Sequence, residues 1–397
     1  MKNNVLIFLL FAFLGACKKA EVTVPIVLPP TNAESNSEWA FNVFKKVNAA
    51  EDSKENIFLS PLSIYTALGM AYNGANGATK TAMEKAMALT GTDVATFNTK
   101  QQALLAYLGS ADKDVTLNIA NSVWGHKDFD ILVSFINQNK TFFGADVKKE
   151  DFRNPATLKL INDWVSAKTN KKIPTILEEI PDNAVLYLIN AVYFNGNWTT
   201  PFQKDGTQNL PFVLENGTTK DVPTMKLTAK LNYFENEQLQ LIDLPYGKNN
   251  AYSMTVLLPK EKKTTQDLIN QLTTANWKTW LAGMKNTDDV FLKFPRFKFE
   301  YKKTLNQTLS DLGMDVAFTD RADFSKISAE KIFISQVLHK TYIDVNETGT
   351  EAAAVTSIGF ETTSVPLGNF MTVNHPFVFV IREAKTGNIT FIGKVKE

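Results

Sequence analysis

The amino-acid sequence predicts a single α+β domain that spans residues 38–397. Helix-like spacing of apolar residues mixes with short strand patterns over residues 38–185, whereas strand-like runs dominate from residue 186 onward. No repeat, coiled-coil heptad or proline- and glycine-rich linker interrupts this region. A chain of 397 residues, 44% of them hydrophobic, is long enough to bury one large core.

Apolar residues at helical spacing predict the first helix of the domain. Ala40, Phe44 and Val47 fall on one face of such a helix. A turn-like run, Asn73–Gly77, precedes a second predicted helix. The sequence GANGATKT (74–81) superficially resembles a phosphate-binding loop. Its glycine and lysine spacing is wrong for that motif, so a structural turn is the better interpretation.

Strand patterns fill the second half of the chain, and a hairpin closes it. Three internal runs rich in β-branched and aromatic residues are predicted strands: Ala251–Leu258, Phe297–Tyr301 and Ile332–Val345. Two further runs near the C-terminus, Phe377–Ile381 and Ile389–Val395, flank residues 384–388. Because residues 384–388 contain the glycine and asparagine that turns require, these runs predict a β-hairpin.

The N-terminus predicts an export signal that ends in a lipid anchor. Residues Val5–Leu14 form an apolar run that is too short for a membrane-spanning helix, which needs about 20 such residues. The run ends in LGAC (14–17), which resembles the bacterial lipobox, where cleavage leaves a lipidated Cys17 at the new N-terminus. We therefore expect a lipoprotein signal peptide at residues 1–16 and a flexible, proline-containing tether at residues 17–37. An ordinary secretory signal with an incidental cysteine is the alternative.

These segments predict an extracytoplasmic protein. The lipid on Cys17 would attach it to a bacterial membrane, on the periplasmic side or at the cell surface, or the protein would be released from there. Cys17 is the only cysteine, so no internal disulfide can form. The 42 basic and 41 acidic residues give a formal net charge of +1. This balance lacks the excess of positive charge that is typical of proteins with nucleic acid as a partner.

Motifs of catalysis and metal binding are absent from the sequence. His126, His339 and His375 are the only imidazole bases, and none lies in a recognisable catalytic context. The sequence contains no G-x-S-x-G, H-E-x-x-H or C-x-x-C motif. Assigning the lone Cys17 to lipidation also excludes a Cys/His enzyme. The sequence therefore predicts neither an enzyme nor a bound metal or other cofactor.

An unusual segment, Gly349–Pro366, alternates between two sets of side chains. One set grows from small to large and carries no charge: Thr350, Ala352, Ala354, Thr356, Ile358 and Phe360. The intervening set contains both acidic residues of the segment: Glu351, Ala353, Val355, Ser357, Gly359 and Glu361. This period of two is typical of a strand with one buried face. On the pattern alone, a plain structural strand is the favoured interpretation.

Sequence motifs across nearly all of residues 38–397 resemble those of the serpin family of serine protease inhibitors. The run ETGTEAAA (347–354) resembles the hinge of inhibitory serpins, and MTVNHPFVFVI (371–381) resembles the family signature that follows the reactive loop. Further segments recur in family order, among them Asn56–Thr79, Ile161–Ile173, Asn190–Trp198, Leu244–Pro259, Leu312–Ser328 and Ile334–Lys340. The resemblance implies a serpin fold with three β-sheets, about eight or nine helices and an exposed reactive-centre loop at about residues 347–370.

The resemblance also implies a function. In serpins a protease cleaves the loop, which then enters the main β-sheet as a new strand and traps the acyl-enzyme. The hinge residues implied here are Glu347, Gly349, Thr350, Glu351, Ala352, Ala353 and Ala354. Family spacing puts the scissile bond at Thr363–Ser364, with cleavage after Phe360, Thr362 or Val365 as alternatives.

The implied partner is a serine protease of elastase-like or subtilisin-like specificity, bound covalently by a monomeric inhibitor. Threonine at the scissile bond suits a small apolar pocket, and the loop lacks the Arg or Lys that trypsin-like enzymes require. Two alternatives remain open at this point. The chain could be a non-inhibitory serpin that acts as a surface binding module, or an inhibitor of papain-like cysteine proteases.

Two groups of residues match serpin positions that control opening of the main sheet. The shutter cluster, expected beneath the opening strands, consists of Ser60, Ser63, Asn190 and His339. The breach group, expected where insertion begins, consists of Trp198, Arg296 and Glu347, the last two as an ion pair. Without the resemblance, a histidine such as His339 would be interpreted as a buried core residue whose hydrogen bonds are satisfied. Its role in controlling the opening of the main sheet is therefore implied by the resemblance alone.

Overall fold

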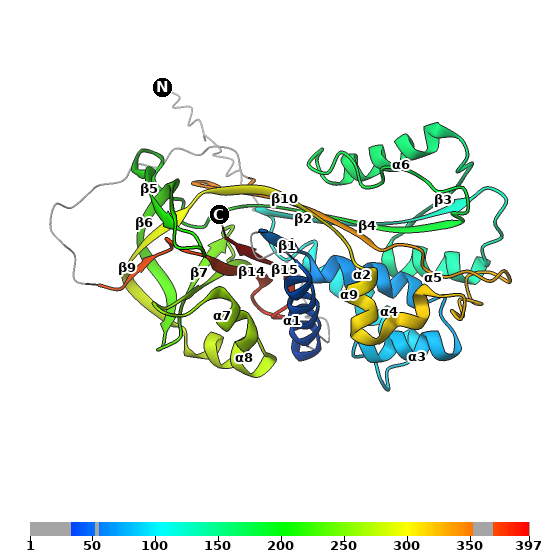
Figure 1. Cartoon of the computed structure of the whole chain (residues 1–397), viewed down its shortest axis with the longest axis horizontal. Coiled ribbons are helices and arrows are strands. Elements are labelled where there is room, and N and C mark those ends of the chain that lie inside the picture. Colours follow the sequence, from blue (N-terminus) through cyan, green and yellow to red (C-terminus); the bar gives the residue numbers. More distant parts are fainter. Residues whose placement is uncertain (1–32, 52–54, 352–367, 397) are drawn as a thin grey trace, which may run out of the picture.

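Two β-sheets and the helices around them make up the part of the chain that the computed structural model describes, namely residues 33–51, 55–351 and 368–396 (Figure 1). The helices in these ranges are α1 (Ala33–Ala50), α2 (Pro61–Tyr72), α3 (Gly77–Ala86), α4 (Val94–Leu108), α5 (Val133–Phe143), α6 (Pro155–Lys168), α7 (Thr265–Gln271), α8 (Thr274–Gly283) and α9 (Asn306–Leu309). Short helical turns lie at Lys204–Gly206, Ser310–Met314 and Asp315–Phe318.

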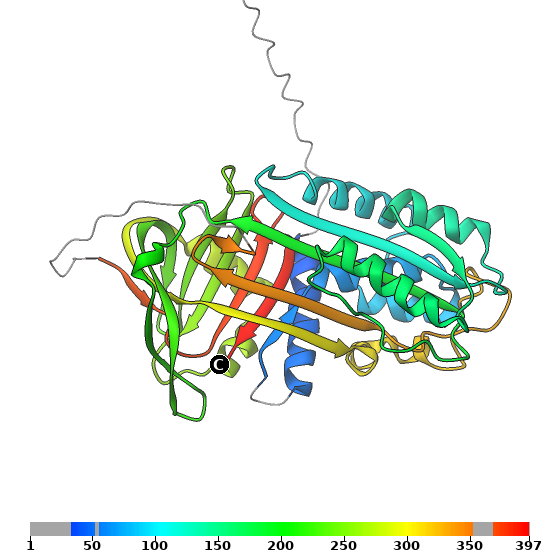
Figure 2. The ribbon, with the colours of Figure 1, turned by 90° about the horizontal axis from the view of Figure 1, so that it is seen from above.

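A six-stranded sheet, called the long sheet below, spans the length of the molecule (Figure 2). Its strands, in spatial order, are β10 (Phe297–Thr304), β11 (Leu338–Asn346), β12 (Gly349–Thr350), β4 (Leu186–Asn197), β2 (Val115–His126) and β3 (Asp146–Glu150). Helix α6 lies across one face of this sheet, and α2, α4 and α5 lie on the other side (Figure 1). Both faces of the sheet are therefore covered along part of its length.

The second sheet has nine strands and carries the C-terminal hairpin. In spatial order its strands are β1 (Ile57–Leu59), β15 (Ile389–Val395), β14 (Phe377–Glu383), β8 (Tyr252–Pro259), β7 (Leu239–Tyr246), β6 (Thr219–Glu235), β9 (Lys285–Pro295) and β13 (Phe370–Thr372), with β5 (Gln208–Val213) also paired to β6. The long strand β6 pairs with β5, β7 and β9, which joins all nine strands through hydrogen bonds. The described residues therefore form two hydrogen-bonded sheets where the resemblance implies three.

Helix α2 begins where its sequence provides a cap. The side chain of Ser60 accepts a hydrogen bond from the backbone N–H of Ser63, and Pro61 occupies the first turn, where its missing N–H is not needed. Ten of the residues of α2 are buried, because the helix packs against both β4 and β15. The cap fixes Ser60 and Ser63 at the underside of the long sheet.

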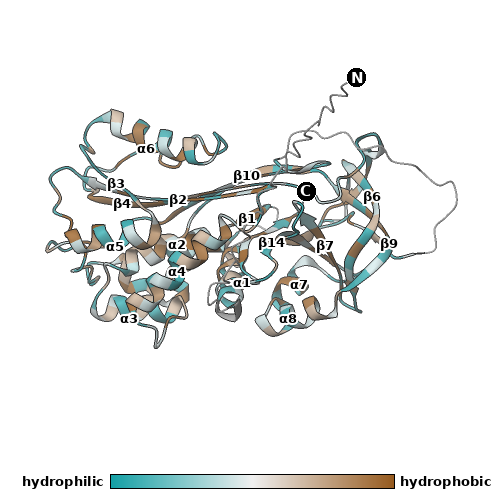
Figure 3. Cartoon of the chain, turned by 180° about the vertical axis from the view of Figure 1, so that it is seen from behind, coloured by the Kyte–Doolittle hydropathy of each residue, from teal (hydrophilic) through white to brown (hydrophobic). Residues whose placement is uncertain are grey.

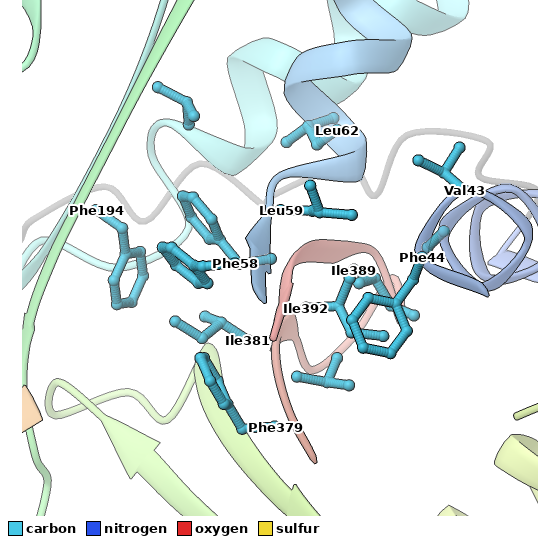
Figure 4. Close-up of a cluster of buried hydrophobic side chains, with 14 of the residues drawn as sticks. Val43, Phe44, Phe58, Leu59, Leu62, Phe194, Phe379, Ile381, Ile389 and Ile392 are labelled. Atoms are coloured by element: carbon cyan, nitrogen blue, oxygen red, sulfur yellow. The ribbon is translucent and has the colours of Figure 1, made fainter. Parts of the chain in front are cut away.

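A continuous apolar core joins the two sheets at their crossing (Figure 4). The ring of Phe58 stacks on Phe391 and Phe379, with centroid separations of 5.0 and 5.6 Å. Phe44 of α1 and Phe194 of β4 belong to the same core. Hydrophobic and hydrophilic residues alternate around the outer helices, for example α6 and α8, as expected for helices with one buried face (Figure 3).

Several sequence predictions of local structure are confirmed. Ala40, Phe44 and Val47 are all fully buried on one face of α1. The predicted hairpin forms as β14 and β15, paired antiparallel. Every residue of both strands is buried. The two runs therefore lack the alternation of apolar and polar residues that is typical of a half-exposed strand.

Two predicted boundaries are wrong. Helix α1 begins at Ala33, so residues 33–37, which we assigned to the tether, are helical. The side chain of Asn36 accepts a hydrogen bond from the backbone N–H of Ile389, at 2.8 Å, which ties this first turn to the C-terminal hairpin. The predicted strand Ile332–Val345 forms only from Leu338 onward, as β11.

The backbone of residues 332–337 has other partners. The N–H of Ile334 donates to the carbonyl of Ala317 at 3.0 Å, and the carbonyl of Val337 accepts from the N–H of Leu305 at 2.8 Å. The side-chain oxygen of Asn306 accepts from the N–H of Val337, also at 2.8 Å. These hydrogen bonds tie the segment to the α9 region instead of to a neighbouring strand, which explains why its strand-like side-chain pattern does not produce a strand.

Candidate functional site: the opening in the long sheet

The first residues of the predicted loop already belong to the long sheet. Gly349 and Thr350 form β12, which pairs antiparallel with β4 on one side and with β11 on the other. Glycine is required at position 349 by close approach, since a Cβ atom there would lie 2.1 Å from the carbonyl oxygen of Gly196. Thr350 is 2% exposed, and its hydroxyl is 2.7 Å from the hydroxyl of Tyr246, a fully buried residue.

The breach group comes together around the turn that precedes β12. The indole N–H of Trp198 donates to the carbonyl of Asn346 at 2.9 Å, and its ring stacks on Tyr246 with a centroid separation of 4.4 Å. Nη1 of Arg296 lies 3.6 Å from Oε1 of Glu347, as the sequence predicts for this ion pair. Glu347 also accepts a hydrogen bond from the hydroxyl of Thr207 at 2.6 Å.

This ion pair is unevenly placed between protein and solvent. The side chain of Glu347 is 10% exposed, whereas that of Arg296 is 47% exposed. Solvent screens a pair of this kind, so we expect it to contribute at most about 1 kcal/mol to the free energy of unfolding. Glu347 lies in the turn between β11 and β12, so the pair and the bond from Thr207 anchor this turn.

The four residues of the shutter cluster form one connected hydrogen-bond network. The backbone N–H of Ser60 donates to Nε2 of His339 at 3.0 Å, and the Ser60 hydroxyl donates to the carbonyl of Thr390 at 2.8 Å. The hydroxyl of Ser63 donates to Oδ1 of Asn190. The N-terminus of α2 therefore touches β11 through His339 and β4 through Asn190, the two strands between which β12 enters.

His339 is a neutral hydrogen-bond acceptor in this network. Burial lowers the pKa of its imidazole to about 3, because a charged ring would be desolvated there. The acceptance of the Ser60 N–H by Nε2 is consistent with a neutral ring.

Asn121 and Tyr246 belong to these groups but were missed at the sequence level. The amide of Asn190 donates to Oδ1 of Asn121 at 2.6 Å, and the amide of Asn121 donates to the carbonyl of Phe143. The available sequence signal for Asn121 is a polar asparagine within the strand-like run that forms β2. Because this side chain is buried, it needs a hydrogen-bond partner. Nothing in the local sequence marks Tyr246, which is brought to Thr350 by the crossing of the two sheets.

Below the shutter cluster, the space between β4 and the chain leading to β11 contains a cavity of about 290 Å³. Leu186, Leu188 and Asn190 line it from β4. The segment before β11 contributes Ile332–Val337, and β11 itself contributes Leu338 and His339. The cavity therefore lies in line with the gap between β4 and β11, which β12 enters at the opposite end.

Other predicted positions lie outside the described residues. These are the lipidation site Cys17, the hinge residues Ala352, Ala353 and Ala354, the scissile pair Thr363 and Ser364, and the alternatives Phe360, Thr362 and Val365. Among the residues the structure does describe, no group of three or more His, Cys, Asp or Glu side chains is placed to hold a metal ion. Likewise, no helix within these ranges is long and apolar enough to cross a membrane.

A family model described as serpin (serine protease inhibitor) matches residues 34–397. The chain belongs to the serpin family. It is 34% identical over 376 residues to Iripin-2 of Ixodes ricinus, an alignment that covers 92% of this chain and 93% of that protein. It is 34% identical over 377 residues to the human leukocyte elastase inhibitor, covering 91% of this chain and 98% of that protein.

The fold agrees with solved serpin structures. The native state of the thermophilic serpin tengpin superposes with a TM-score of 0.83 at 34% sequence identity, covering 92% of this chain and 94% of tengpin. The predicted serpin fold is therefore confirmed. The chain is a homologue of serine protease inhibitors and not an enzyme.

Proposed function

We propose that this serpin is an irreversible, single-use inhibitor of serine endopeptidases with elastase-like or subtilisin-like specificity. The catalytic serine of the protease attacks the carbonyl carbon of Thr363, the bond from that carbon to the nitrogen of Ser364 breaks, and that nitrogen takes a proton and becomes the new amino terminus of the C-terminal segment. An ester then joins the protease to Thr363. Insertion of the cleaved loop into the long sheet removes the ester from the geometry needed for its hydrolysis.

The register of β12 is the observation that carries this proposal. Gly349 lies opposite Asn197 on β4 and Asn346 on β11, and Thr350 lies opposite Gly196 and Val345. Continuing this register along β4, and along β11 and the segment that precedes it, assigns each later loop residue a pair of neighbours. Three of these assignments are Thr356 between Asn190 and His339, Ile358 between Leu188 and Val337, and Phe360 between Leu186 and Ser335.

All six of these neighbours line the cavity beneath the opening. The uncharged loop residues would therefore face the cavity, with the hydroxyl of Thr356 at the shutter cluster and Ile358 and Phe360 in the apolar space beyond it. Burial of each large side chain contributes roughly 1.5–3 kcal/mol. The acidic residue Glu361 falls in the opposite set, away from this apolar space, which supports the same register.

The length of the loop matches the displacement that inhibition requires. About fourteen residues at roughly 3.3 Å each would carry Thr363 about 45 Å along the sheet. An ester-linked protease would be moved from one end of the long sheet to the other. We expect the active site of the protease to be distorted by this move faster than water can hydrolyse the ester.

Threonine at the scissile bond supports the proposed specificity. A β-branched, small side chain at position 363 fits a shallow apolar pocket, and no Arg or Lys occurs in residues 349–370. Similarity to a protein named leukocyte elastase inhibitor points in the same direction.

Incubation with an elastase-like protease tests the proposed inhibition. We expect a covalent complex that survives boiling in detergent, together with a C-terminal peptide, freed by the denaturation, whose mass matches a fragment that begins at Ser364. Protease whose catalytic serine has been chemically blocked should give neither product. The variant Thr363→Arg should shift complex formation to a trypsin-like enzyme. Release of the peptide without any covalent complex would contradict the proposal, because the chain would then be a substrate only.

We further propose that the protein acts outside the cytoplasm, tethered to a bacterial membrane by the lipid on Cys17. The lipobox-like sequence LGAC (14–17) and the apolar run before it support this location. A variant in which an ordinary cleavable secretory signal replaces residues 1–17, which also supplies soluble protein for the incubation above, is expected to leave the membrane fraction. Its retention there would contradict the anchor without affecting the inhibition test.

A further inference from the structure

The short strand β12 ends at a strained residue, Glu351. Its φ of +58° is left-handed, a conformation that non-glycine residues rarely adopt and that turns the chain away from an extended path. Two backbone hydrogen bonds hold it there: its N–H donates to the carbonyl of Asp344 at 2.9 Å, and its carbonyl accepts from the side-chain amide of Asn195. For the next loop residue to enter the sheet in register, Glu351 must become extended.

The side chain of Glu351 is buried, with 2% of its surface exposed. None of the described residues donates a hydrogen bond to its Oε2 atom. The nearest cation is Nζ of Lys172, at 3.8 Å, in the connection between α6 and β4. Burial raises the pKa of the Glu351 carboxyl to about 7, an effect that Lys172 offsets only in part.

Lys172 ties the α6 side of the molecule to the opening. Its ammonium lies over the ring of Tyr342 on β11, 4.8 Å from the ring centroid, as well as near Glu351. The other titratable groups that face this site are Tyr193 on β4 and Asp344 on β11. Lys298 on β10 lies behind them, 3.5 Å from Asp344. Lys172 is thus the one basic side chain among the described residues that contacts both β11 and the end of β12.

We propose that Glu351 and Lys172 form a pH-sensitive latch that holds the chain at the end of β12 and sets how readily the rest of the loop follows. The left-handed backbone and the buried carboxyl both belong to the latched state only. Release of Glu351 from the edges of β11 and β4 breaks its contacts with Lys172, Asp344 and Asn195 together. The proposal rests on the proposed function for its biological role, because only an inserting loop needs to be held.

The sign of the pH dependence follows from the two states of the carboxyl. A solvated glutamate ionises near its ordinary pKa of 4.5, whereas the buried one ionises near 7. Protons therefore bind more tightly to the latched state. The latch is strongest below pH 4.5, weakens as the pH rises from 4.5 to 7, and changes little above pH 7.

Hydrogen exchange of the intact, uncleaved protein tests the latch. The observable is the protection factor of the Glu351 amide, in which the intrinsic chemical exchange rate has been divided out. We expect this factor to fall by up to about tenfold per pH unit between pH 5 and pH 7, and then to level off. The isosteric variant Glu351→Gln should show no such fall. The same pH course in both proteins would overturn the proposal.

Two lysine variants separate the role of Lys172 from a general loss of charge. Lys172→Gln should reduce protection at pH 7.5, where the carboxylate is ionised, and change it little at pH 5. Lys171→Gln, which removes a charge from the exposed neighbouring residue, should match the unmodified protein at both pH values. If the two variants behave alike, Lys172 has no specific role. Because no protease is used, this result is independent of whether a covalent complex forms.

Discussion

Replacing Thr350 by arginine is expected to convert the protein from an inhibitor into a substrate of its target protease. Thr350 is 2% exposed within β12, and its hydroxyl contacts that of the fully buried Tyr246. A guanidinium at this position would have to be buried beside an uncharged phenol, which costs several kcal/mol. Since about 1.4 kcal/mol corresponds to a factor of ten, insertion should slow by at least about 100-fold relative to hydrolysis of the ester.

The measurement is the number of inhibitor molecules consumed for each protease molecule inactivated. Thr350→Arg should be cleaved at the same bond with no detectable covalent complex, whereas Thr350→Ser, which keeps a small side chain and the hydroxyl, should inhibit normally. Thermal unfolding of both uncleaved variants checks that they fold. A covalent complex formed by Thr350→Arg at the normal stoichiometry would show that β12 does not lie on the path of insertion.

Replacing Ile358 by aspartate is expected to stop insertion further along the same path. The register of β12 assigns Ile358 to a position between Leu188 and Val337, both of which line the cavity. The aspartate forfeits roughly 1.5–3 kcal/mol of apolar burial and adds the cost of placing a carboxylate in an apolar space. We expect at least about a tenfold loss in the fraction of encounters that end in a covalent complex.

Ile358→Leu is the matched control, because it preserves side-chain volume and apolar character. It should form the complex with nearly unchanged stoichiometry. The position is remote from the scissile bond, so both variants should be cleaved at similar rates. Equal inhibition by Ile358→Asp and Ile358→Leu would mean that residue 358 does not face the cavity and that the register continues differently.

Local periodicity explains which elements could be predicted from the sequence. The buried face of α1 and the hairpin of β14 and β15 follow from side-chain patterns that each segment carries within itself. Residues 332–337 were mispredicted for the opposite reason. Their pattern suits a strand, but their backbone groups bond to Leu305, Asn306 and Ala317, which lie elsewhere in the sequence.

The candidate site also divides into residues that could be predicted from the sequence and residues that could not. The shutter cluster and the breach group were located through family resemblance, and the structure brings each of them together. Asn121 and Tyr246, which complete these two groups, and Lys172, which lies beside Glu351, could not be found this way. Each meets its partner only through packing of distant segments: Asn121 is 69 residues from Asn190 in the sequence, and Tyr246 is 104 residues from Thr350.

The central claim is that the cleaved loop becomes a strand of the long sheet in the register that β12 begins. The most direct test is the melting temperature of the protein before and after cleavage of the loop. Burial of Ile358 and Phe360 alone contributes roughly 3–6 kcal/mol, and we expect the melting temperature to rise by about 10 °C or more. A cleaved protein that melts at or below the temperature of the uncleaved protein would contradict the claim.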